Sequence, residues 1–501
     1  MAKRSFFPLE TFGQSKSYQL LPFHFIRLNA ATELLVNCVG EYLYAPPGSV
    51  QQIAQGKLSP DSDLYQELRA KQFLYDDASS PLLDMLATKY RTKRSFLNGF
   101  TQLHIFVATL RCEHSCPYCQ VSRQCEDRSR YDMTEASADG FLKLMFRSPA
   151  KNLTLEFQGG EPLLNFPLIR YVTERAEELA ESSQRNLRVV IATNLALLTQ
   201  EVLSYVKEHN IYLSTSLDGP EDLHNANRPR PGANSHQLVL EHIQMARDFL
   251  GFDKVSALMT TTKNSLNRGQ EIVNEYVRLG FRSIFLRRLS PYGFAVKTAR
   301  AIGYDHEVFM EFYIKTLDYI IGLNRRGIYL EEAYAKLMLS KILTPFPVGY
   351  VDLQSPAGAG IGVAVYNYDG KVYASDEARM LAEMGDDTFL LGDVHENTYQ
   401  EIFGGAKLVH TVKESCVEAI PGCADCAFQT YCGADPVYNY ATQSDLMGLR
   451  PTNGFCKTNM AILKHLFGLL QNADRELMRI FLSWVREVSH EEMKEAAPCL
   501  N

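Results

Sequence analysis

The stretch "LHIFVATLRCEHSCPYCQ", residues 103–120, joins a run of apolar residues to three closely spaced cysteines. The apolar run up to Leu110 is typical of a buried strand in a parallel sheet. Cys112, Cys116 and Cys119 follow at once, so they fall on a loop after a strand, where functional groups of α/β folds gather. The stretch therefore predicts both the first strand of an α/β fold and the place of its functional site.

The middle of the chain repeats this pattern from residue 101 to about residue 288. Short apolar runs alternate with amphipathic helical segments, the rhythm of a parallel sheet. We expect strands at residues 103–110, 152–159, 188–194, 211–218, 255–262 and 283–291. We expect helices between them at residues 135–148, 167–183, 197–210 and 236–251. Six units predict a full or partial (β/α)6 barrel, whose chemistry lies at the C-terminal ends of the strands.

Two further parts flank this barrel. The first contains about three short strands up to residue 44 and two helices, at residues 46–58 and 59–74. The basic run at residues 89–95 is expected to be a solvated linker. The last part is irregular and closes with a pair of helices at residues 459–488. The predicted domains are therefore residues 1–98, 99–340 and 341–501.

Composition and charge exclude several classes of function. The chain has 501 residues, 46% hydrophobic and 22% charged, and its formal net charge of −7 argues against a nucleic-acid partner. Pro8 and Glu10 interrupt the N-terminus before a signal peptide can form, and no run reaches the roughly 18 apolar residues of a membrane span. We therefore expect a cytoplasmic protein, in which the 11 cysteines are metal ligands or buried thiols.

The number of thiols in the first group is informative. Structural zinc takes four ligands, commonly as two close pairs. An electron-carrying 4Fe-4S cluster also takes four thiolates, whereas a cluster held by three keeps one iron open to a further ligand. Cys125 would complete a closed set, and this alternative stays open.

The spacing of Cys112, Cys116 and Cys119, with the aromatic Tyr118 before the last, resembles the radical SAM family. The resemblance implies that the three thiolates hold a 4Fe-4S cluster whose open iron binds S-adenosylmethionine (SAM). It also implies that electron transfer to SAM yields a 5'-deoxyadenosyl radical, and that Tyr118 contributes to the cofactor site.

Further motifs follow at the ends of the next expected strands. Glycines let a ligand approach the backbone closely, and an ammonium group requires acceptor oxygens. The resemblance assigns the methionyl amino group to Gly159, Gly160, Glu161 and Pro162. It assigns the ribose and carboxylate of the nucleoside to Asn194, Ser216 and Arg228. His224 is expected to be a local capping or surface residue.

A second cysteine group lies near the C-terminus and resembles the SPASM extension of peptide-modifying radical SAM enzymes. That extension carries two auxiliary clusters in its full form, but here Ser355, Ser375 and Pro436 stand near expected thiols, so we expect the first cluster to be missing. One complete set predicts an auxiliary 4Fe-4S cluster, which would carry an electron: Cys423, Cys426, Cys432 and Cys456. A zinc site is the alternative, and Cys416 could replace a ligand in either.

The flanking parts suggest how a substrate is handled. The N-terminal strands and helices resemble the winged-helix peptide-recognition domain of ribosomal-peptide maturases, which would bind a leader peptide as an added strand. Asp376 stands where some relatives carry an acidic proton acceptor, which would have to lie close to the substrate. Across the chain, the resemblance is to the His-Xaa-Ser system radical SAM maturase group.

These resemblances imply a maturase that abstracts hydrogen from a ribosomally made precursor peptide and leaves a cross-link or an oxidised residue. The implied partners are the precursor and an external electron donor. A second maturase subunit is a further partner that the resemblance allows. The alternative is oxidation of Cys or Ser to formylglycine in a sulfatase.

Overall fold

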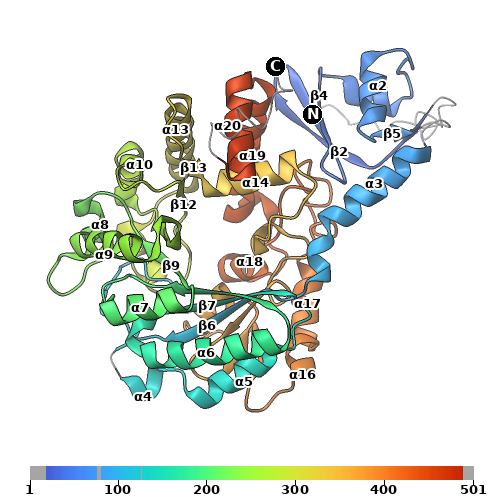
Figure 1. Ribbon diagram of the computed structural model, residues 1–501. Coiled ribbons are helices and arrows are strands. Elements are labelled where there is room, and N and C mark those ends of the chain that lie inside the picture. The colour runs from blue at the N-terminus through green and yellow to red at the C-terminus, as the bar shows by residue number, and fades with distance from the viewer. Residues whose placement is uncertain (1–17, 76–79, 126, 489–501) are drawn as a thin grey trace.

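The computed structural model describes residues 18–75, 80–125 and 127–488, and its centre is a nine-stranded sheet (Figure 1). The strand order is β12-β10-β9-β8-β7-β6-β14-β15-β16. The first six of these strands are parallel: β6 Leu103–Thr109, β7 Asn152–Gly159, β8 Asn186–Ala192, β9 Tyr212–Ser216, β10 Val255–Thr260 and β12 Leu286–Arg287. The partial barrel is therefore confirmed. The sixth predicted strand is split, because β11 (Ser283–Ile284) pairs instead with β13 (Glu331–Glu332).

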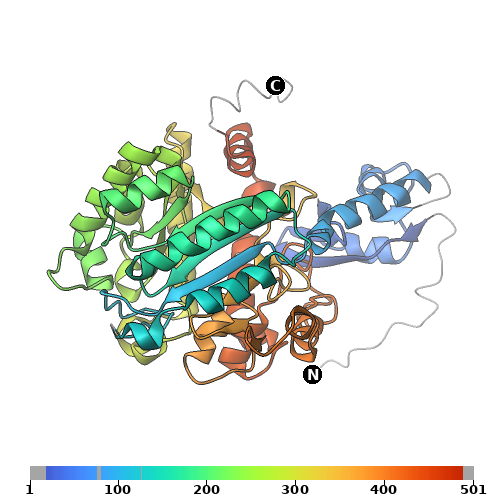
Figure 2. The same ribbon diagram turned by 60° about the horizontal axis from the view of Figure 1, so that its bottom comes forward.

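Helices cover the outer face of the barrel strands, as α5 and α6 do in Figure 2. In β7, Leu153, Leu155 and Phe157 are buried, whereas Glu156 and Gln158 point to the opposite face, into the barrel. The barrel helices are α4 Arg128–Tyr131, α5 Glu135–Met145, α6 Phe166–Ser182, α7 Gln200–Glu208, α8 Glu221–Asn227, α9 Ser235–Leu250 and α10 Gly269–Arg278. Four of them, α5, α6, α7 and α9, match the predicted helices, whereas α4, α8 and α10 were not predicted.

The N-terminal part carries an antiparallel sheet in the order β2-β3-β4, beside a two-stranded ribbon of β1 and β5. Its elements are β1 Gln19–Leu20, β2 Phe23–Asn29, β3 Thr32–Asn37, β4 Tyr42–Ala45, α1 Ser49–Ala54, α2 Asp63–Ala70, β5 Leu74–Tyr75 and α3 Ser80–Lys93. The predicted solvated linker at residues 89–95 is wrong, because this run ends α3 and Lys93 donates to the Lys341 carbonyl at 3.0 Å. The predicted absence of a signal peptide concerns residues that lie outside those described.

The C-terminal part is joined to the barrel by strand pairing. β14 (Val363–Tyr366) runs parallel to β6, and the sheet continues with antiparallel pairing through β15 (Lys371–Tyr373) to β16 (Leu390–Asp393). The domain boundary predicted at residue 340 therefore divides one continuous sheet, and the three domains stay a prediction.

The remaining helices follow the barrel strands in the chain. They are α11 Phe294–Lys297, α12 Ala299–Ile302, α13 His306–Arg325, α14 Ala333–Leu343, α15 Asp376–Ala382, α16 Tyr399–Phe403, α17 Ala406–Glu414, α18 Pro436–Gln443, α19 Gly454–Gln471 and α20 Arg475–Arg486. The predicted closing pair is α19 and α20, and the buried Trp484 of α20 donates to Asn324 of α13 at 3.3 Å. Every helix in the described part of the chain is too short or too polar to span a lipid bilayer.

Candidate functional site

A cavity of about 240 Å³ lies at the C-terminal ends of β6 to β10, where the barrel fold places chemistry. Most of the predicted cofactor residues line this cavity, although they come from five separate segments of the chain. Its lining includes Cys112, Cys116, Tyr118, Cys119, Gly159, Gly160, Asn194, Ser216, Arg228 and Asp376. Glu161 and Pro162 are the predicted residues that do not line it. Cys125 is exposed and does not line the cavity either.

Buried polar contacts hold the cysteine loop in place. Arg111, directly before Cys112, forms a two-pronged ion pair with Asp132, with Nε to Oδ1 at 2.6 Å and Nη2 to Oδ2 at 2.8 Å. At the other end of the loop, the carbonyl of Cys119 accepts from the Phe294 amide at 2.8 Å. Gly293 permits this approach, because a Cβ there would lie 2.7 Å from the Cys119 oxygen. The three thiols are therefore set by the fold around them.

The thiols of this loop fit an iron–sulfur cluster. Burial raises the pKa of Cys116 to about 12 and raises that of Cys112 further, so both are protonated in the absence of metal. A buried thiolate is stabilised when it binds a metal, because the metal replaces the lost hydration of the charge. The Arg228 guanidinium acts in the same direction on Cys116. This donor set of three thiols and no fourth suits a cluster with one open iron.

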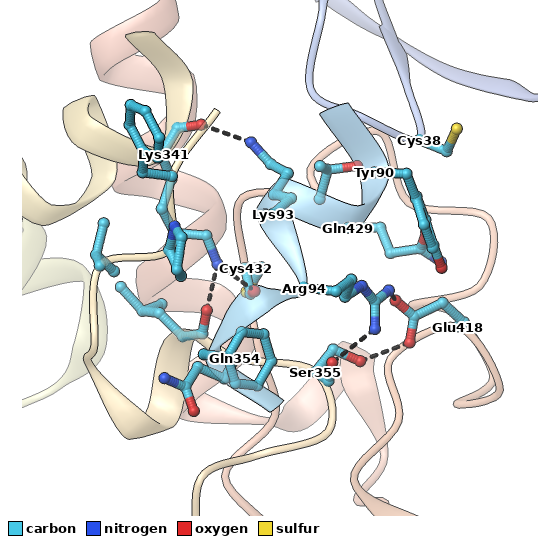
Figure 3. A pocket seen from close by; sticks show the side chains of 16 residues that line it. Cys38, Tyr90, Lys93, Arg94, Lys341, Gln354, Ser355, Glu418, Gln429 and Cys432 are labelled. Carbon is cyan, nitrogen blue, oxygen red and sulfur yellow. Dashed lines mark hydrogen bonds and ion pairs between the residues drawn. The ribbon is translucent and has the colours of Figure 1, made fainter. Parts of the chain in front are cut away.

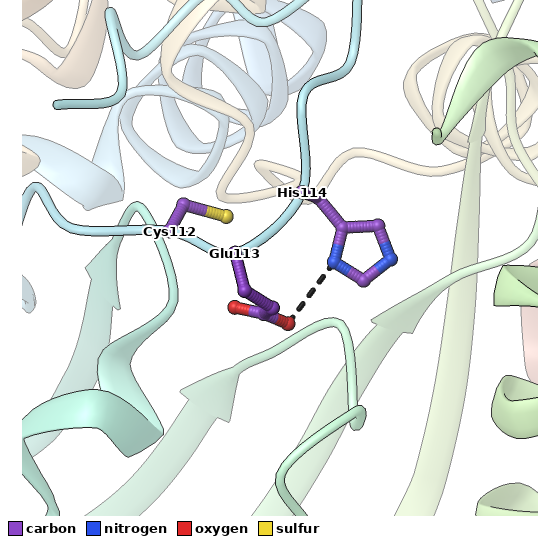
Figure 4. Close-up of side chains that lie close together, drawn as sticks. All are labelled: Cys112, Glu113 and His114. Carbon is purple, nitrogen blue, oxygen red and sulfur yellow. Dashed lines mark hydrogen bonds and ion pairs between the residues drawn. The ribbon is translucent and has the colours of Figure 1, made fainter. Parts of the chain in front are cut away.

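Figure 4 shows a second arrangement in this loop, which the sequence did not reveal. Ligand atoms of Cys112, Glu113 and His114 lie within 4.8 Å of one another. Glu113 Oε1, however, already pairs with His114 Nδ1 at 3.0 Å and accepts from Asn194 at 2.8 Å, and His114 Nε2 contacts Ser235 at 3.0 Å. Burial acts to raise the pKa of Glu113, but the hydrogen bonds from His114, the backbone and Asn194 and the charge of His114 together outweigh it, and the pKa is lowered. The group therefore braces the loop against the end of β8.

A buried carboxylate organises the cofactor side of the cavity. Asp218 Oδ2 accepts from the Tyr118 hydroxyl at 2.6 Å and from Arg228 Nε at 3.1 Å, while Oδ1 accepts from the Thr260 amide. The Arg228 guanidinium also lies 5.3 Å from the centre of the Tyr118 ring. Asp218 is fully buried and does not line the cavity. In the sequence, this role is indicated by the position of Asp218 directly after β9 and close to Ser216.

His224 lies behind this group. It is buried, its Nδ1 accepts from the Asp218 amide at 3.2 Å, and its Nε2 contacts Ser235 at 3.2 Å. Its contact with the Asp218 amide fits the predicted local capping role, but the alternative of a surface residue is wrong because the side chain is buried. The interior position explains why burial lowers its pKa.

The GGEP segment divides into two roles. A Cβ on Gly159 would lie 2.0 Å from the Thr109 oxygen, and one on Gly160 would lie 2.2 Å from the Arg111 oxygen, so only glycine fits at either position. Glu161 is fully buried and accepts from the Thr193 hydroxyl at 2.7 Å and from the Asn194 amide at 2.8 Å. Burial raises its pKa to about 8. Glu161 therefore ties the end of β7 to the end of β8, and direct contact with SAM stays a prediction.

Asp376 and Glu156 are far apart in the sequence, but both line this cavity. Asp376 begins α15, and its Oδ1 accepts from the buried Arg379 at 2.8 Å, which fixes the carboxylate at the cavity wall. Glu156 lies within β7, and burial together with the nearby Asp376 raises its pKa. Glu156 was not predicted from the sequence, although an acidic residue at an inward position of a barrel strand is a usable signal.

The cysteines of the second group also line a single cavity. A cavity of about 340 Å³ is lined by Cys423, Cys426, Cys432 and Cys456. Cys426 Sγ accepts from the Phe428 amide and Cys432 Sγ from Asn459 Nδ2, both at 3.4 Å, and such hydrogen bonds are typical of cluster thiolates. These four cysteines fit an auxiliary cluster. Cys416 does not line the cavity, and its thiol donates to the Val412 carbonyl at 3.5 Å.

The three residues that stand near further expected thiols have structural roles. Ser355 donates to Glu418 at 2.5 Å, and its carbonyl accepts from Arg94 at 2.7 Å (Figure 3). Ser375 accepts from the Ala378 amide as the N-cap of α15, and Pro436 is the first residue of α18.

The pocket in Figure 3, about 110 Å³, borders the second cysteine group. Lys341 lies on its wall and donates to the Cys432 carbonyl at 3.0 Å. Burial lowers the pKa of Lys341 to about 7.

Comparison with known proteins agrees with this geometry. Residues 106–269 match the radical SAM superfamily. The uncharacterized protein MJ0907 of Methanocaldococcus jannaschii is 26% identical over 190 residues, which are 37% of this chain and 62% of that protein. A cysteine-type anaerobic sulfatase-maturating enzyme of Clostridium perfringens (strain 13 / Type A) is 21% identical over 382 residues, which are 73% of this chain and 96% of that enzyme.

A solved structure shares the fold. The structure of anSMEcpe with bound AdoMet and Kp18Cys peptide superposes with a TM-score of 0.61 at 17% identity, over 74% of this chain and 98% of that one. The barrel of this chain is therefore a radical SAM domain, a type of domain that uses a 4Fe-4S cluster and SAM. The match with MJ0907 spans less than two thirds of that relative.

Proposed function

We propose that this chain is a radical SAM maturase that modifies a ribosomally made precursor peptide, leaving a cross-link or an oxidised residue. The observation that carries the proposal is that Cys112, Cys116 and Cys119 share one cavity with the acidic side chain of Asp376. The second cysteine group and the similarity to a sulfatase-maturating enzyme support a polypeptide substrate.

Each residue set has a part in this reaction. When bound, the two clusters and SAM supply a 5'-deoxyadenosyl radical and a site that accepts one electron. Net loss of two hydrogens from the substrate then comprises one hydrogen atom, one electron and one proton. Asp376 accepts the proton, because its carboxylate is fixed by Arg379 at the wall of the cavity. Tyr118, Arg228 and Asp218 orient the cofactor through their shared hydrogen bonds.

The N-terminal sheet is the proposed holder of the precursor. Its β4 side is fixed to α19, because the Tyr44 hydroxyl donates to the Phe467 carbonyl at 2.8 Å. β2 is the opposite edge strand, and Phe25 on it is 52% exposed. A leader peptide would pair with this edge by strand addition. An external electron donor, and a second maturase subunit, complete the proposed set of partners.

Anaerobically reconstituted protein with SAM and dithionite tests the first half of the proposal. We expect 5'-deoxyadenosine, measured by liquid chromatography and mass spectrometry, and none from Cys116→Ala. Absence of 5'-deoxyadenosine from wild-type protein with a full complement of iron would overturn the proposal.

Co-expression with the small open reading frame beside the gene tests the substrate. We expect the peptide to lose two hydrogens, and Asp376→Asn to lower the yield of this product while leaving SAM binding in place. The same site supports formylglycine formation as a second candidate, favoured by the similarity to the sulfatase-maturating enzyme. An aldehyde that reacts with hydrazines identifies that product, whereas a cross-link does not react. An unshifted peptide mass with active SAM cleavage would remove the peptide-maturase assignment.

A further inference from the structure

A third cavity lies between the two cysteine sites. Its volume is about 140 Å³, which exceeds the space of one water molecule several times. Arg287 lines both this cavity and the one with the first cysteine trio. Phe455 lines both this cavity and the one with the second cysteine group. The third cavity therefore adjoins both sites, with Arg287 on one boundary and Phe455 on the other.

Three carboxylates from separate elements meet in this cavity. Asp352 lies in a 3-10 turn (Val351–Leu353), Glu377 is in the first turn of α15, and Asp435 is the N-cap of α18. Burial raises the pKa of all three, and each is raised further by a neighbouring acid; that of Asp435 rises to about 7. This placement destabilises the empty protein, because three acids share a space shielded from water.

The protein supplies too little positive charge to balance them. Arg287 faces Asp352 and Glu377 and acts to lower their pKa values. Arg288 also lines the cavity, but it donates to the Gly454 carbonyl at 3.1 Å and to the Thr458 hydroxyl at 3.2 Å. Even when Arg288 is counted, two arginines cannot balance three ionised carboxylates. The cavity is therefore short of cations.

A second observation points independently to an occupant. Tyr292 lines the cavity and is only 1% exposed, and its hydroxyl is buried without a hydrogen-bond partner among the described residues. A buried, unpaired hydroxyl costs about 1–3 kcal/mol, so such groups usually have a partner. The three carboxylates are its acidic neighbours. A ligand in the cavity would satisfy this hydroxyl as well as the carboxylates.

The walls suit an organic cation better than a metal ion. Tyr334 and Tyr350 contact each other edge to face with ring centres 5.8 Å apart, and Phe285 stacks on Tyr334 at 5.9 Å. Aromatic faces attract ammonium and guanidinium groups. Within the described residues, the three carboxylates do not form a group with ligand atoms inside 4.8 Å of one another, as a compact metal site would.

We infer that this cavity binds a basic side chain, lysine or arginine, of the polypeptide substrate. The inference rests on the proposed function, which it deepens by naming the kind of residue that the enzyme recognises. Glu377 and Asp376 are neighbours in the chain but face different cavities, the first this one and the second the cofactor cavity. A basic residue held by Glu377 therefore places the adjoining peptide beside Asp376.

Capped pentapeptides test the inference without knowledge of the natural substrate. The probes are acetyl-Gly-Gly-Xaa-Gly-Gly-amide with arginine or its neutral analogue citrulline at Xaa, and with lysine or its neutral analogue norleucine. Binding to anaerobically reconstituted protein with SAM is measured by isothermal titration calorimetry. We expect a cationic peptide to bind at least tenfold tighter than its neutral analogue. Equal binding of both members of each pair would overturn the inference.

Variants assign this preference to the cavity. Asp352→Asn should remove most of the tenfold preference, and Tyr292→Phe should weaken binding of the cationic peptide while keeping the ring in place. Glu311→Gln, on the exposed face of α13, should leave the preference unchanged. Thermal melting checks folding, and Asp352→Asn should melt no lower than wild type because it removes a buried acid. A preference that persists in Asp352→Asn and Tyr292→Phe would refute the assignment.

The two proposals fail in different ways. Formation of 5'-deoxyadenosine in the same samples together with equal binding of the paired peptides would refute the basic pocket and leave the radical chemistry intact. Charge-selective binding without 5'-deoxyadenosine would support the pocket and refute the proposed function.

Discussion

The ion pair that holds the cysteine loop should contribute far more stability than an exposed pair of the same geometry. Arg111 and Asp132 are 3% and 16% exposed at their side chains and form two hydrogen bonds of 2.6 and 2.8 Å. Arg268 and Asp222 form two bonds of 2.6 and 2.9 Å, but their side chains are 24% and 73% exposed. The change to asparagine at Asp132 and at Asp222 therefore compares a buried pair with an exposed one, in which Arg268 also keeps Glu271 as a partner at 2.6 Å.

The expected magnitudes follow from what each change leaves behind. Asp132→Asn leaves the Arg111 charge buried without a counter-ion, and breaking a buried pair costs about 3–5 kcal/mol. We expect about 3 kcal/mol, because the asparagine oxygen still accepts one hydrogen bond and Asp132 is partly exposed. Asp222→Asn should cost about 0.2–1 kcal/mol, since water solvates both partners of an exposed pair.

Urea denaturation of the two variants under anaerobic conditions measures this difference, with circular dichroism as the probe. Because Arg111 directly precedes Cys112, Asp132→Asn should also lower the iron bound per chain and the rate of 5'-deoxyadenosine formation, whereas Asp222→Asn should change neither. Equal stability and equal iron content of the two variants would refute the reasoning that this ion pair sets the loop.

Three further changes have defined outcomes. Cys423→Ala should lower bound iron by about four atoms per chain, and Cys416→Ser should leave it unchanged, as measured by iron assay; equal loss in both would place Cys416 in the ligand set. Tyr118→Phe removes the hydroxyl that donates to Asp218 and should weaken SAM binding about tenfold, or 1.4 kcal/mol, by calorimetry. The pKa of Asp435 is about 7 instead of 3.8, so the folded chain keeps a proton that the unfolded chain loses, and stability falls as pH rises between these values. Asp435→Asn should flatten that fall in thermal melts, and an unchanged slope would contradict it.

Local sequence was sufficient for the barrel strands and for the place where most of the predicted cofactor residues meet. The apolar run before Cys112 forms β6 as expected, and the predicted strand at residues 152–159 coincides with β7. The predicted residues at strand ends meet in one cavity, because parallel strands bring their C-terminal ends to the same edge of the sheet. The sixth strand was less well predicted, since β11 and β12 are each only two residues long and pair with different partners.

Tertiary structure alone decided what lies beyond those strand ends. The pairing of β14 with β6 joins segments more than 250 residues apart in the chain and brings Asp376 to the cofactor cavity. The meeting of Asp352, Glu377 and Asp435 likewise depends on three separate elements. Side-chain alternation and cysteine spacing are encoded between near neighbours, so the sequence by itself determined the barrel and the thiol sets. Contacts between distant segments depend on how finished elements pack, so only the fold determined the acidic cavity between the two cysteine sites.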